Sequence, residues 1–411
     1  MIAVGDRRLS GTLNLADVRE AARRRLPRGI FEFIDRGAED DDALANNREA
    51  FRRIRLRPRV LVDVSGRSAA TTLFGRPQAM PLAIAPTGAA GLVWFEGELE
   101  LARAAAAAEV PFTLATRSLA SIESVAEAAA GGTLWFQLYV WAECALSYAL
   151  VERAERAGFH ALVVTVDVPV TPNREYNRRN GFSLPFRPSG RALLDMARHP
   201  RWLVGTMGRY LATTGMPRYE NQPGQRRQRI TQGEPAVRSM RSDDLTWDDI
   251  RELRRRWPRT LIVKGLLRAE DALRAVECGA DAVVVSNHGG RCLDSAVAPI
   301  DALPEIADAV GHRAVVLMDG GVRRGGDIVK ALALGASAVL AGRPTLYGTA
   351  IGGRAGAAHV LDLLRAEMLT VMAQLGCRSI ADIGPDLVHP GTAPGRRTMT
   401  SAAANPALAS A

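Results

Sequence analysis

Apolar and polar positions follow two alternating rhythms from about residue 80 onward. Short runs of three to six mostly apolar residues are typical of strands buried on both faces of a parallel sheet. Eight such strands are predicted at Pro81–Ala85, Pro111–Ala115, Leu134–Tyr139, Ala161–Val166, Leu261–Val263, Ala282–Val285, Ala314–Met318 and Ala338–Ala341. The segments between them carry apolar residues at helical spacing, and several end at glycine. Helices are accordingly predicted at Ser121–Ala130, Leu146–Ala157, Ala269–Cys278 and Asp327–Leu334.

Eight consecutive strand-helix units predict an α/β fold, a TIM (β/α)8 barrel that occupies about residues 80–376. The alternative is a doubly wound sheet with a smaller second domain. That fold would place a glycine-rich phosphate turn after its first strand, and Pro86-Thr87-Gly88 is not such a turn. The barrel is therefore the preferred prediction, within one domain over residues 1–383.

Residues 10–57 precede the barrel and carry helix signals. Asn14 is a suitable N-cap, and apolar residues follow it at helical spacing up to Leu26. Pro27 suits the opening of a second segment, and the acidic run 39–42 suits the solvated start of a helix. These signals predict an N-terminal helical cap.

A long stretch between the predicted fourth and fifth strands interrupts the rhythm. Residues 181–245 lack the barrel pattern and are predicted to form an insertion. Within it, residues 196–219 contain no Asp or Glu and interleave arginine with large apolar side chains. This segment is either a basic amphipathic surface, with membrane contact through residues 186–219, or a lid packed over the active site. Residues 220–243 and the tail 384–411 are predicted to be flexible.

The composition describes a globular protein, with 47% hydrophobic and 24% charged residues. Its four cysteines form no CxxC pair and have no histidine at metal-ligand spacing, which favours a reducing compartment and no metal site. The longest uncharged run, residues 77–95, is interrupted by proline and glycine, so no membrane-spanning helix is predicted. A cytoplasmic location is expected.

The formal net charge is +9 and comes almost wholly from arginine. Such an excess suits nucleic acid, a membrane surface or anionic substrates. Many arginines alternate with acids on predicted helices, and they form no single basic tract interleaved with aromatic residues. Nucleic-acid binding on a barrel without catalysis is therefore the less favoured hypothesis.

Polar and charged side chains stand where the predicted strands end. In a barrel these ends meet on one face, which is where TIM-barrel enzymes place their active sites. Each residue alone has an ordinary explanation, such as a capping hydroxyl or a solvated charge, but together they favour a functional site. The residues are Pro86, Thr87, Gly88, Thr116, Gln137, Tyr139, Thr165, Asp167, Lys264, Ser286, His288, Asp319, Gly321, Arg323, Gly342 and Arg343.

Residues 281–294, DAVVVSNHGGRCLD, carry the most specific chemistry. Gly289 and Gly290 permit a tight turn after the strand. They separate His288, which can accept a proton near neutral pH, from the permanent cation of Arg291. A base and an anion-binding group are thus placed together, although a capped histidine and a surface arginine would explain this segment taken alone.

The last two predicted units resemble a phosphate site. Residues 319–325 and 342–344 combine open backbone amides with arginine side chains, at the position where barrels commonly bind phosphate. Lys264 can place a cation beside an electron-rich ring. Three side chains from other strand ends can hydrogen-bond the polar edge of that ring: Gln137, Thr165 and Ser286. Together these features favour a phosphorylated flavin.

From about Leu15 to Ile383 the chain resembles the FMN-dependent α-hydroxy-acid dehydrogenase and oxidase family. That family includes flavin-type lactate dehydrogenases, glycolate oxidase and mandelate dehydrogenase. The resemblance is carried by SNHGGRCLD, DGGVRRGGDIVKALALGA, WFQLYV, VTVDVP and VKG, with Cys292 where glutamine is usual. WPRTLIVKGLLRAEDA and GRPTLYG look most similar to mandelate dehydrogenase.

The resemblance implies an enzyme that oxidises a lactate-like or mandelate-like L-2-hydroxy acid to the 2-oxo acid, with FMN across the barrel mouth. His288 would be the base, oriented by Asp167, while Arg174 and Arg291 would bind the substrate carboxylate. The other implied catalytic residues are Tyr139, at the reacting oxygen, and Lys264, at the reduced flavin. The implied FMN-binding residues are Pro86, Thr87, Gly88, Gln137, Thr165, Lys264, Ser286, Asp319, Gly320, Gly321, Val322, Arg323, Gly342 and Arg343.

Three departures from the family pattern lie at the predicted site. Phe33 stands where many members have a tyrosine that helps hold the carboxylate, so this substrate-binding position should be more apolar. Ala115 replaces a serine near the flavin edge. Arg117 takes a pocket position that is often Trp, Val or Ala, and either points to solvent or recognises a second anionic group on the substrate.

Gly88 bears on the electron acceptor, because its position in this family is often Ala in oxidases and Gly in dehydrogenases. It predicts slow reaction with oxygen and transfer to a quinone or similar acceptor. The alternatives are a soluble oxidase that forms H2O2 and a flavin enzyme acting on a peptide-derived intermediate. The resemblance also implies a homo-oligomer, taken as a tetramer. The basic, apolar segment 196–219 favours peripheral contact with the inner face of the cell membrane, where quinones reside.

Overall fold

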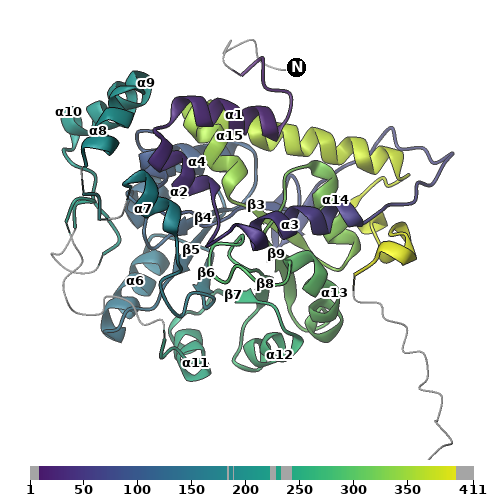
Figure 1. The fold of residues 1–411 in the computed structure, drawn as a ribbon. Coiled ribbons are helices and arrows are strands. Elements are labelled where there is room, and N and C mark those ends of the chain that lie inside the picture. The colour runs from purple at the N-terminus through teal and green to yellow at the C-terminus, as the bar shows by residue number, and fades with distance from the viewer. Residues whose placement is uncertain (1–8, 183–184, 188, 223–227, 233–242, 395–411) are drawn as a thin grey trace, which may run out of the picture.

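The computed structural model describes residues 9–182, 185–187, 189–222, 228–232 and 243–394. Eight parallel strands close into a barrel in the order β10-β3-β4-β5-β6-β7-β8-β9 (Figure 1), which confirms the predicted TIM barrel. The strands are β3 Leu82–Ile84, β4 Phe112–Ala115, β5 Leu134–Leu138, β6 Ala161–Thr165, β7 Thr260–Leu266, β8 Ala282–Val285, β9 Val315–Met318 and β10 Ala338–Ala341.

Each predicted strand corresponds to one of these eight, and the largest difference is in β7. The apolar run ends at Val263, but the strand continues through Lys264 to Leu266. Lys264 pairs in register with Thr165 of β6 and Val284 of β8, and its side chain is buried. The predicted strand was too short because it was drawn from apolar residues alone, whereas this lysine is accommodated in the strand by a buried ion pair.

A hairpin that the sequence analysis did not predict closes the N-terminal end of the barrel. Strands β1 Thr71–Leu73 and β2 Arg76–Gln78 pair antiparallel. Phe74, at the turn, meets Trp135 at the start of β5 edge-on, with ring centroids 5.8 Å apart. The barrel interior is therefore a packed apolar core, and ligands can enter only at the other end.

Helices surround the barrel (Figure 1). They are η1 Ala90–Leu92, α4 Gly97–Ala107, α5 Ile122–Ala128, α6 Cys144–Arg156, α11 Trp247–Arg256, α12 Ala269–Glu277, α13 Pro299–Val310, α14 Gly325–Ala333 and α15 Arg343–Gln374. The last of these is two helices joined at a kink, where Gly353 has a φ of +56°. A side chain at Gly353 would collide with the Trp94 indole, so the kink requires glycine.

The predicted N-terminal cap consists of α1 Leu15–Arg25, α2 Arg28–Asp35 and α3 Asp42–Arg53. The Asn14 side chain caps α1 by accepting hydrogen bonds from the backbone of Ala16 and Asp17. Asp294, beyond β8, accepts hydrogen bonds from the backbone of Asp40 and Ala43 at the start of α3. The cap is thereby attached to the C-terminal end of the barrel.

Short helices follow β6. The first, α7 Glu175–Asn180, contacts α2. The predicted insertion forms α8 Gly190–Ala197, α9 Pro200–Trp202, the π-helix η2 Leu203–Gly208 and α10 Arg209–Thr213, at the edge of the molecule (Figure 1). Buried Trp202 donates its indole hydrogen to the Leu92 carbonyl at 2.7 Å, and the Tyr210 hydroxyl accepts from the Glu96 backbone at 3.0 Å. The insertion therefore docks on the side of the barrel next to α4.

Parts of two segments that were predicted to be flexible lie outside the described residues, namely 223–227, 233–242 and 395–411. The ordered chain extends beyond residue 383, since Leu387 and Val388 are buried. The short 3₁₀ helices of this region are η3 Ile380–Asp382, η4 Pro385–Leu387 and η5 Pro390–Thr392. The first residues of the predicted tail thus pack against the rest of the chain, and the apolar pair that does so gives no periodic signal in the sequence. No helix within the described ranges is long and apolar enough to cross a membrane.

Candidate active site

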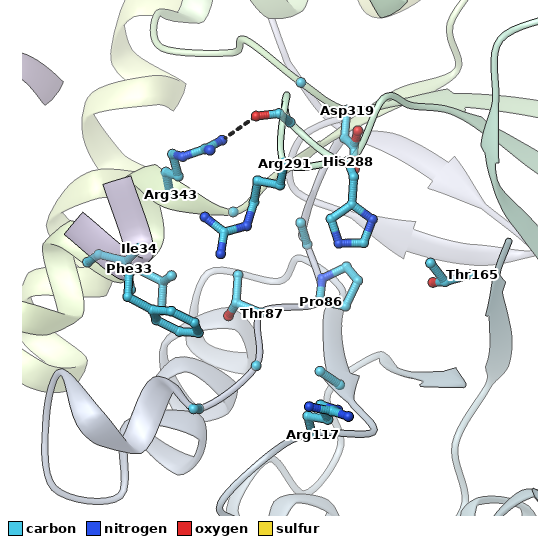
Figure 2. A pocket seen from close by; sticks show the side chains of 18 of the residues that line it. Phe33, Ile34, Pro86, Thr87, Arg117, Thr165, His288, Arg291, Asp319 and Arg343 are labelled. Carbon is cyan, nitrogen blue, oxygen red and sulfur yellow. Dashed lines mark hydrogen bonds between the residues drawn. The ribbon is translucent and has the colours of Figure 1, made fainter. Parts of the chain in front are cut away.

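A cavity of about 740 Å³ opens at the C-terminal ends of the strands. Its size falls within the ~300–1,000 Å³ range of small-molecule sites. Of the predicted site residues, Thr116, Asp167 and Ser286 lie behind the wall and all others line the cavity, several of them visible in Figure 2. The lining members are Phe33, Pro86, Thr87, Gly88, Gln137, Tyr139, Thr165, Arg174, Lys264, His288, Arg291, Asp319, Gly320, Gly321, Val322, Arg323, Gly342 and Arg343.

His288 and Asp167 form the pair expected of a general base and the group that orients it. His288 Nδ1 lies 2.8 Å from Asp167 Oδ1, and the Tyr139 hydroxyl lies 3.3 Å from His288 Nε2. His288 has a left-handed backbone with a φ of +57°, stabilised by a hydrogen bond from its backbone nitrogen to Ser286 Oγ. Burial opposes a charge on the imidazole, but the Asp167 carboxylate outweighs it and raises the His288 pKa well above its usual value.

Lys264 of β7 supplies a buried cation at the base of the cavity. Its Nζ lies 3.0 Å from Asp319 Oδ2 and 4.0 Å from Asp167 Oδ2, and it donates to Ser286 Oγ at 2.9 Å. Burial disfavours the ammonium charge, yet the two carboxylates raise the Lys264 pKa above its ordinary value. The lysine therefore stays charged near neutral pH.

Arg174 and Arg291 bring two guanidinium groups to one wall. Arg174 Nη2 donates to the Arg291 carbonyl at 3.3 Å, and its buried Nε has no hydrogen-bond partner among the described residues. Arg291 donates to the Arg36 carbonyl at 2.7 Å, and its guanidinium carbon lies 5.5 Å from the Phe33 ring centroid. Burial, and then repulsion by Arg291, lower the Arg174 pKa to about 10. A bound carboxylate would relieve both effects.

Another anion site lies beside Arg291, at the start of α15: Arg343 and Arg291 donate to the same carbonyl, that of Arg36. Gly320 and Gly321 have φ values of +87° and +88°, which turn the backbone after β9 toward the cavity. Arg343 donates to the carbonyls of Asp35, Gly289 and Arg36 at 2.9, 2.8 and 3.0 Å. Burial lowers the Arg343 pKa to about 10 and also lowers that of Arg323. Two buried cations beside a helix N-terminus suit a phosphate group.

The residues present fit a phosphorylated flavin. The cation-rich wall takes the phosphate, and the Asp319 Oδ1 atom is buried without a hydrogen-bond partner in the part of the chain that the structure describes. Gln137 donates to Thr165 Oγ1 at 3.0 Å, so both side chains are held at the edge where a polar ring would lie. Lys264 adds the cation that an electron-accepting ring requires.

Three side chains could hold a soft metal ion. Ligand atoms of Asp167, His288 and Cys292 lie within 4.8 Å of one another. A metal ion there would displace the hydrogen bond between Asp167 and His288 and would lie near the Lys264 ammonium. The arrangement therefore suits proton transfer better than metal coordination.

Two functional-site contacts were missed from the sequence. Arg48 of α3 donates to Asp327 Oδ2 at 2.8 Å and to the Gly321 carbonyl, which fixes the glycine turn of the anion site. Asn47 contacts Asn287, the residue before His288. In the sequence, Asn47 and Arg48 look like ordinary solvent-exposed polar residues of a surface helix. Neither position carries a signal that indicates a buried contact.

The comparisons with known proteins agree with this geometry. The sequence profile of the family described as FMN-dependent dehydrogenase matches residues 22–390. The chain is 44% identical over 384 residues to an L-lactate oxidase from Nostoc sp., which covers 93% of this chain and 99% of that protein. It is 42% identical over 376 residues to (S)-mandelate dehydrogenase from Pseudomonas putida, which covers 92% of this chain and 93% of the relative.

A solved structure of (S)-mandelate dehydrogenase, described as a monotopic membrane protein, matches with a TM-score of 0.87 at 42% identity. It covers 92% of this chain and 99% of the solved chain. The barrel, the base and cation geometry at its mouth, and a profile match over most of the sequence lead to one conclusion: this chain belongs to the FMN-dependent dehydrogenase family.

Proposed function

We propose that the protein is an (S)-2-hydroxy-acid dehydrogenase that uses FMN to oxidise its substrate to the 2-oxo acid. The observation that carries this proposal is the convergence of a carboxylate-oriented histidine and two guanidinium groups on one cavity. A 2-hydroxy acid needs a base at its reacting carbon and a cationic site for its carboxylate, and this wall provides both.

Bound FMN supplies the acceptor for the two electrons. Its phosphate would be held by the backbone from Gly320 to Val322 and by Arg323, Gly342 and Arg343. Its ring would lie against the remaining predicted residues: Pro86, Thr87, Gly88, Gln137, Thr165, Lys264, Ser286 and Asp319.

The side chains around His288 would bind the substrate and carry out the proton chemistry. Arg174 and Arg291 bind the substrate carboxylate and so fix the hydroxyl-bearing carbon, while Tyr139 hydrogen-bonds the oxygen. The neutral imidazole of His288 takes a proton, either from the α-carbon or from the hydroxyl. Asp167 then stabilises the imidazolium that forms. Both routes place the base at the same atom, His288 Nε2.

Anaerobic mixing with lactate, glycolate, mandelate and longer 2-hydroxy acids tests the proposal, with loss of the flavin absorbance as the measurement. His288→Gln is the control, because the cofactor contacts lie elsewhere and FMN should stay bound. We expect the variant to be reduced at least ~10²-fold more slowly than the wild type, the usual contribution of a general base. Reduction of the variant at the wild-type rate would remove His288 from the mechanism.

We further propose that a membrane quinone is the acceptor and that the insertion contacts the bilayer. Large apolar side chains on α8 to α10 face solvent, with exposed fractions of 55% for Leu193, 54% for Leu194, 70% for Val204 and 56% for Leu211. Exposed arginines accompany them, and each contributes on the order of 1 kcal/mol of attraction to an anionic surface. No described residue of α8 to α10 lines the cavity, which favours the membrane-contact interpretation of this segment over the lid.

Liposome flotation with and without anionic lipid tests this docking. Leu193→Ser with Leu194→Ser should abolish flotation without loss of FMN, because both side chains are already exposed. Val60→Ser with Leu61→Ser is the control, since these residues are more exposed than Leu193 and Leu194 but lie outside the insertion. If the wild type never floats, or if the Leu193→Ser, Leu194→Ser variant floats as well as the wild type, this surface does not dock on the membrane.

The tetramer implied by the family resemblance is also part of the proposal. Light scattering on the purified holoenzyme measures the mass directly, and a mass near the 44.2 kDa of one chain would exclude it.

A further inference from the structure

Two arginines that line the cavity have no role in the proposed function. Among the described lining residues, seven are Arg or Lys and one, Asp319, is acidic. The proposed function assigns two arginines to the cofactor phosphate, two to the substrate carboxylate, and Lys264 to the flavin ring. Arg117 and Arg178 remain, and both line the same cavity.

Arg117 stands at the end of β4 beside the segment Pro86–Gly88. Its carbonyl accepts a hydrogen bond from the Ala89 backbone at 3.0 Å, and a Cβ at Gly88 would lie 3.6 Å from the Arg117 Cβ. In the view of Figure 2, Arg117 lies at the bottom, well apart from Arg343 at the upper left, and Pro86 lies between Arg117 and His288. Arg117 is thus remote from the site for the cofactor phosphate.

Arg178 reaches the cavity from the last turn of α7, the helix that begins directly after Arg174. It is exposed and forms no hydrogen bond or ion pair with any residue in the described ranges. Asn177, beside it on the wall, has a buried Oδ1 atom that likewise lacks a partner there. The outer part of the cavity is therefore polar and cationic, beyond the pair that holds the substrate carboxylate.

We propose that the preferred substrates are 2-hydroxy acids with a second carboxylate on the side chain, bound by Arg117 and Arg178. The proposal rests on the proposed function, since Arg174 and Arg291 must take the carboxylate next to the hydroxyl. An apolar side chain in this region would desolvate guanidinium groups without replacing the lost hydrogen bonds. A carboxylate forms charge-assisted hydrogen bonds with the same groups. The site therefore favours a substrate with a second carboxylate and disfavours one with an apolar side chain.

The test compares L-2-hydroxyglutarate and L-malate with L-lactate, (S)-mandelate and (S)-2-hydroxy-5-methylhexanoate, whose isopropyl group replaces the distal carboxylate of 2-hydroxyglutarate. The measured quantity is the ratio of kcat/KM for 2-hydroxyglutarate to that for the isopropyl analogue. We expect a ratio of at least about tenfold in the wild type, the lower end of what a charge-assisted hydrogen bond contributes. The ratio should fall as ionic strength rises, because the outer region is open to solvent.

Arg117→Met and Arg178→Met should each lower the ratio several-fold. Arg156→Met removes one charge from an exposed position on α6 outside the cavity, and the ratio should stay at the wild-type value. A ratio within one preparation does not depend on how much of the enzyme is folded or loaded with FMN. Perturbation of the oxidised flavin spectrum by 2-oxoglutarate, titrated into His288→Gln, measures the same preference without turnover.

The outcomes separate the two proposals. If none of the acids reduces the flavin, the proposed function fails. Suppose that the acids with an uncharged side chain reduce the flavin, but the ratio is at or below one or is unchanged in both arginine variants. The proposal of a second anion site is then wrong, while the proposed dehydrogenase activity stands.

Discussion

Asn47 of α3 and Asn287, the residue before the proposed base, exchange two side-chain hydrogen bonds. Asn47 Nδ2 donates to Asn287 Oδ1 at 2.9 Å, and Asn287 Nδ2 donates to Asn47 Oδ1 at 2.7 Å. Asn287 Oδ1 also accepts from the Gly290 backbone at 3.1 Å. Both amides are buried, so the N-terminal cap fixes the loop that holds His288 in its left-handed conformation.

Asn47→Ala should therefore affect both stability and catalysis. It removes one hydrogen-bond partner from the oxygen and one from the nitrogen of the buried Asn287 amide, which keeps its bonds to the Gly290 backbone and the Val297 carbonyl. This loss costs about 1–3 kcal/mol of unfolding free energy. The loss of His288 positioning should lower kcat more than it raises KM, which separates it from simple destabilisation. Denaturant unfolding and steady-state kinetics on the same preparation measure the two effects. Glu49→Ala, on the exposed face of the same helix, should change neither appreciably.

Asp167→Asn tests the raised pKa of His288. The base must be neutral to accept a proton, so the wild-type rate should rise with pH through the raised imidazole pKa. Removal of the carboxylate lowers this pKa, and the acidic limb of the pH profile for kcat/KM should move to lower pH. The maximal rate should nevertheless fall by ~10²-fold or more, because the imidazolium is no longer stabilised. An acidic limb that moves upward or stays in place would contradict the assigned pair.

Replacement of the paired arginines tests carboxylate recognition. Arg291→Met or Arg174→Met should lower kcat/KM for every 2-hydroxy acid, since each truncation removes a charge-assisted hydrogen bond worth about 1.5–3 kcal/mol. Arg→Lys at either position keeps the charge but loses the two-pronged geometry, so recovery should be partial. Full activity in the lysine variants would mean that the substrate is held by charge alone.

The reoxidation of the reduced enzyme tests the acceptor. The wild type should react faster with a soluble quinone than with air in stopped-flow measurements. Gly88→Ala should fold normally, because the added Cβ would lie 3.4 Å from the Arg117 carbonyl, an ordinary contact. Oxidases of this family often have Ala at this position and dehydrogenases often have Gly, so we expect the variant to react faster with air than the wild type. A wild type reoxidised fastest by air would instead be an oxidase.

The barrel and most of the residues of the candidate site follow from the sequence pattern alone. Buried parallel strands need unbroken apolar runs, and such runs between helical stretches leave few other folds. Because parallel strands end on one face, listing the residues at their ends was enough to bring His288, Tyr139 and Arg343 to one cavity. This inference needs no knowledge of side-chain orientation.

The contacts between distant segments could not be predicted from the sequence. The pairing of Asn47 with Asn287 joins residues 240 positions apart, and that of Arg48 with Asp327 joins residues 279 apart. Lys264 appeared to end its strand because its two partner carboxylates lie on other strands. The strength of a polar interaction depends on burial and on the distance between its partners, and neither is fixed until the chain has folded.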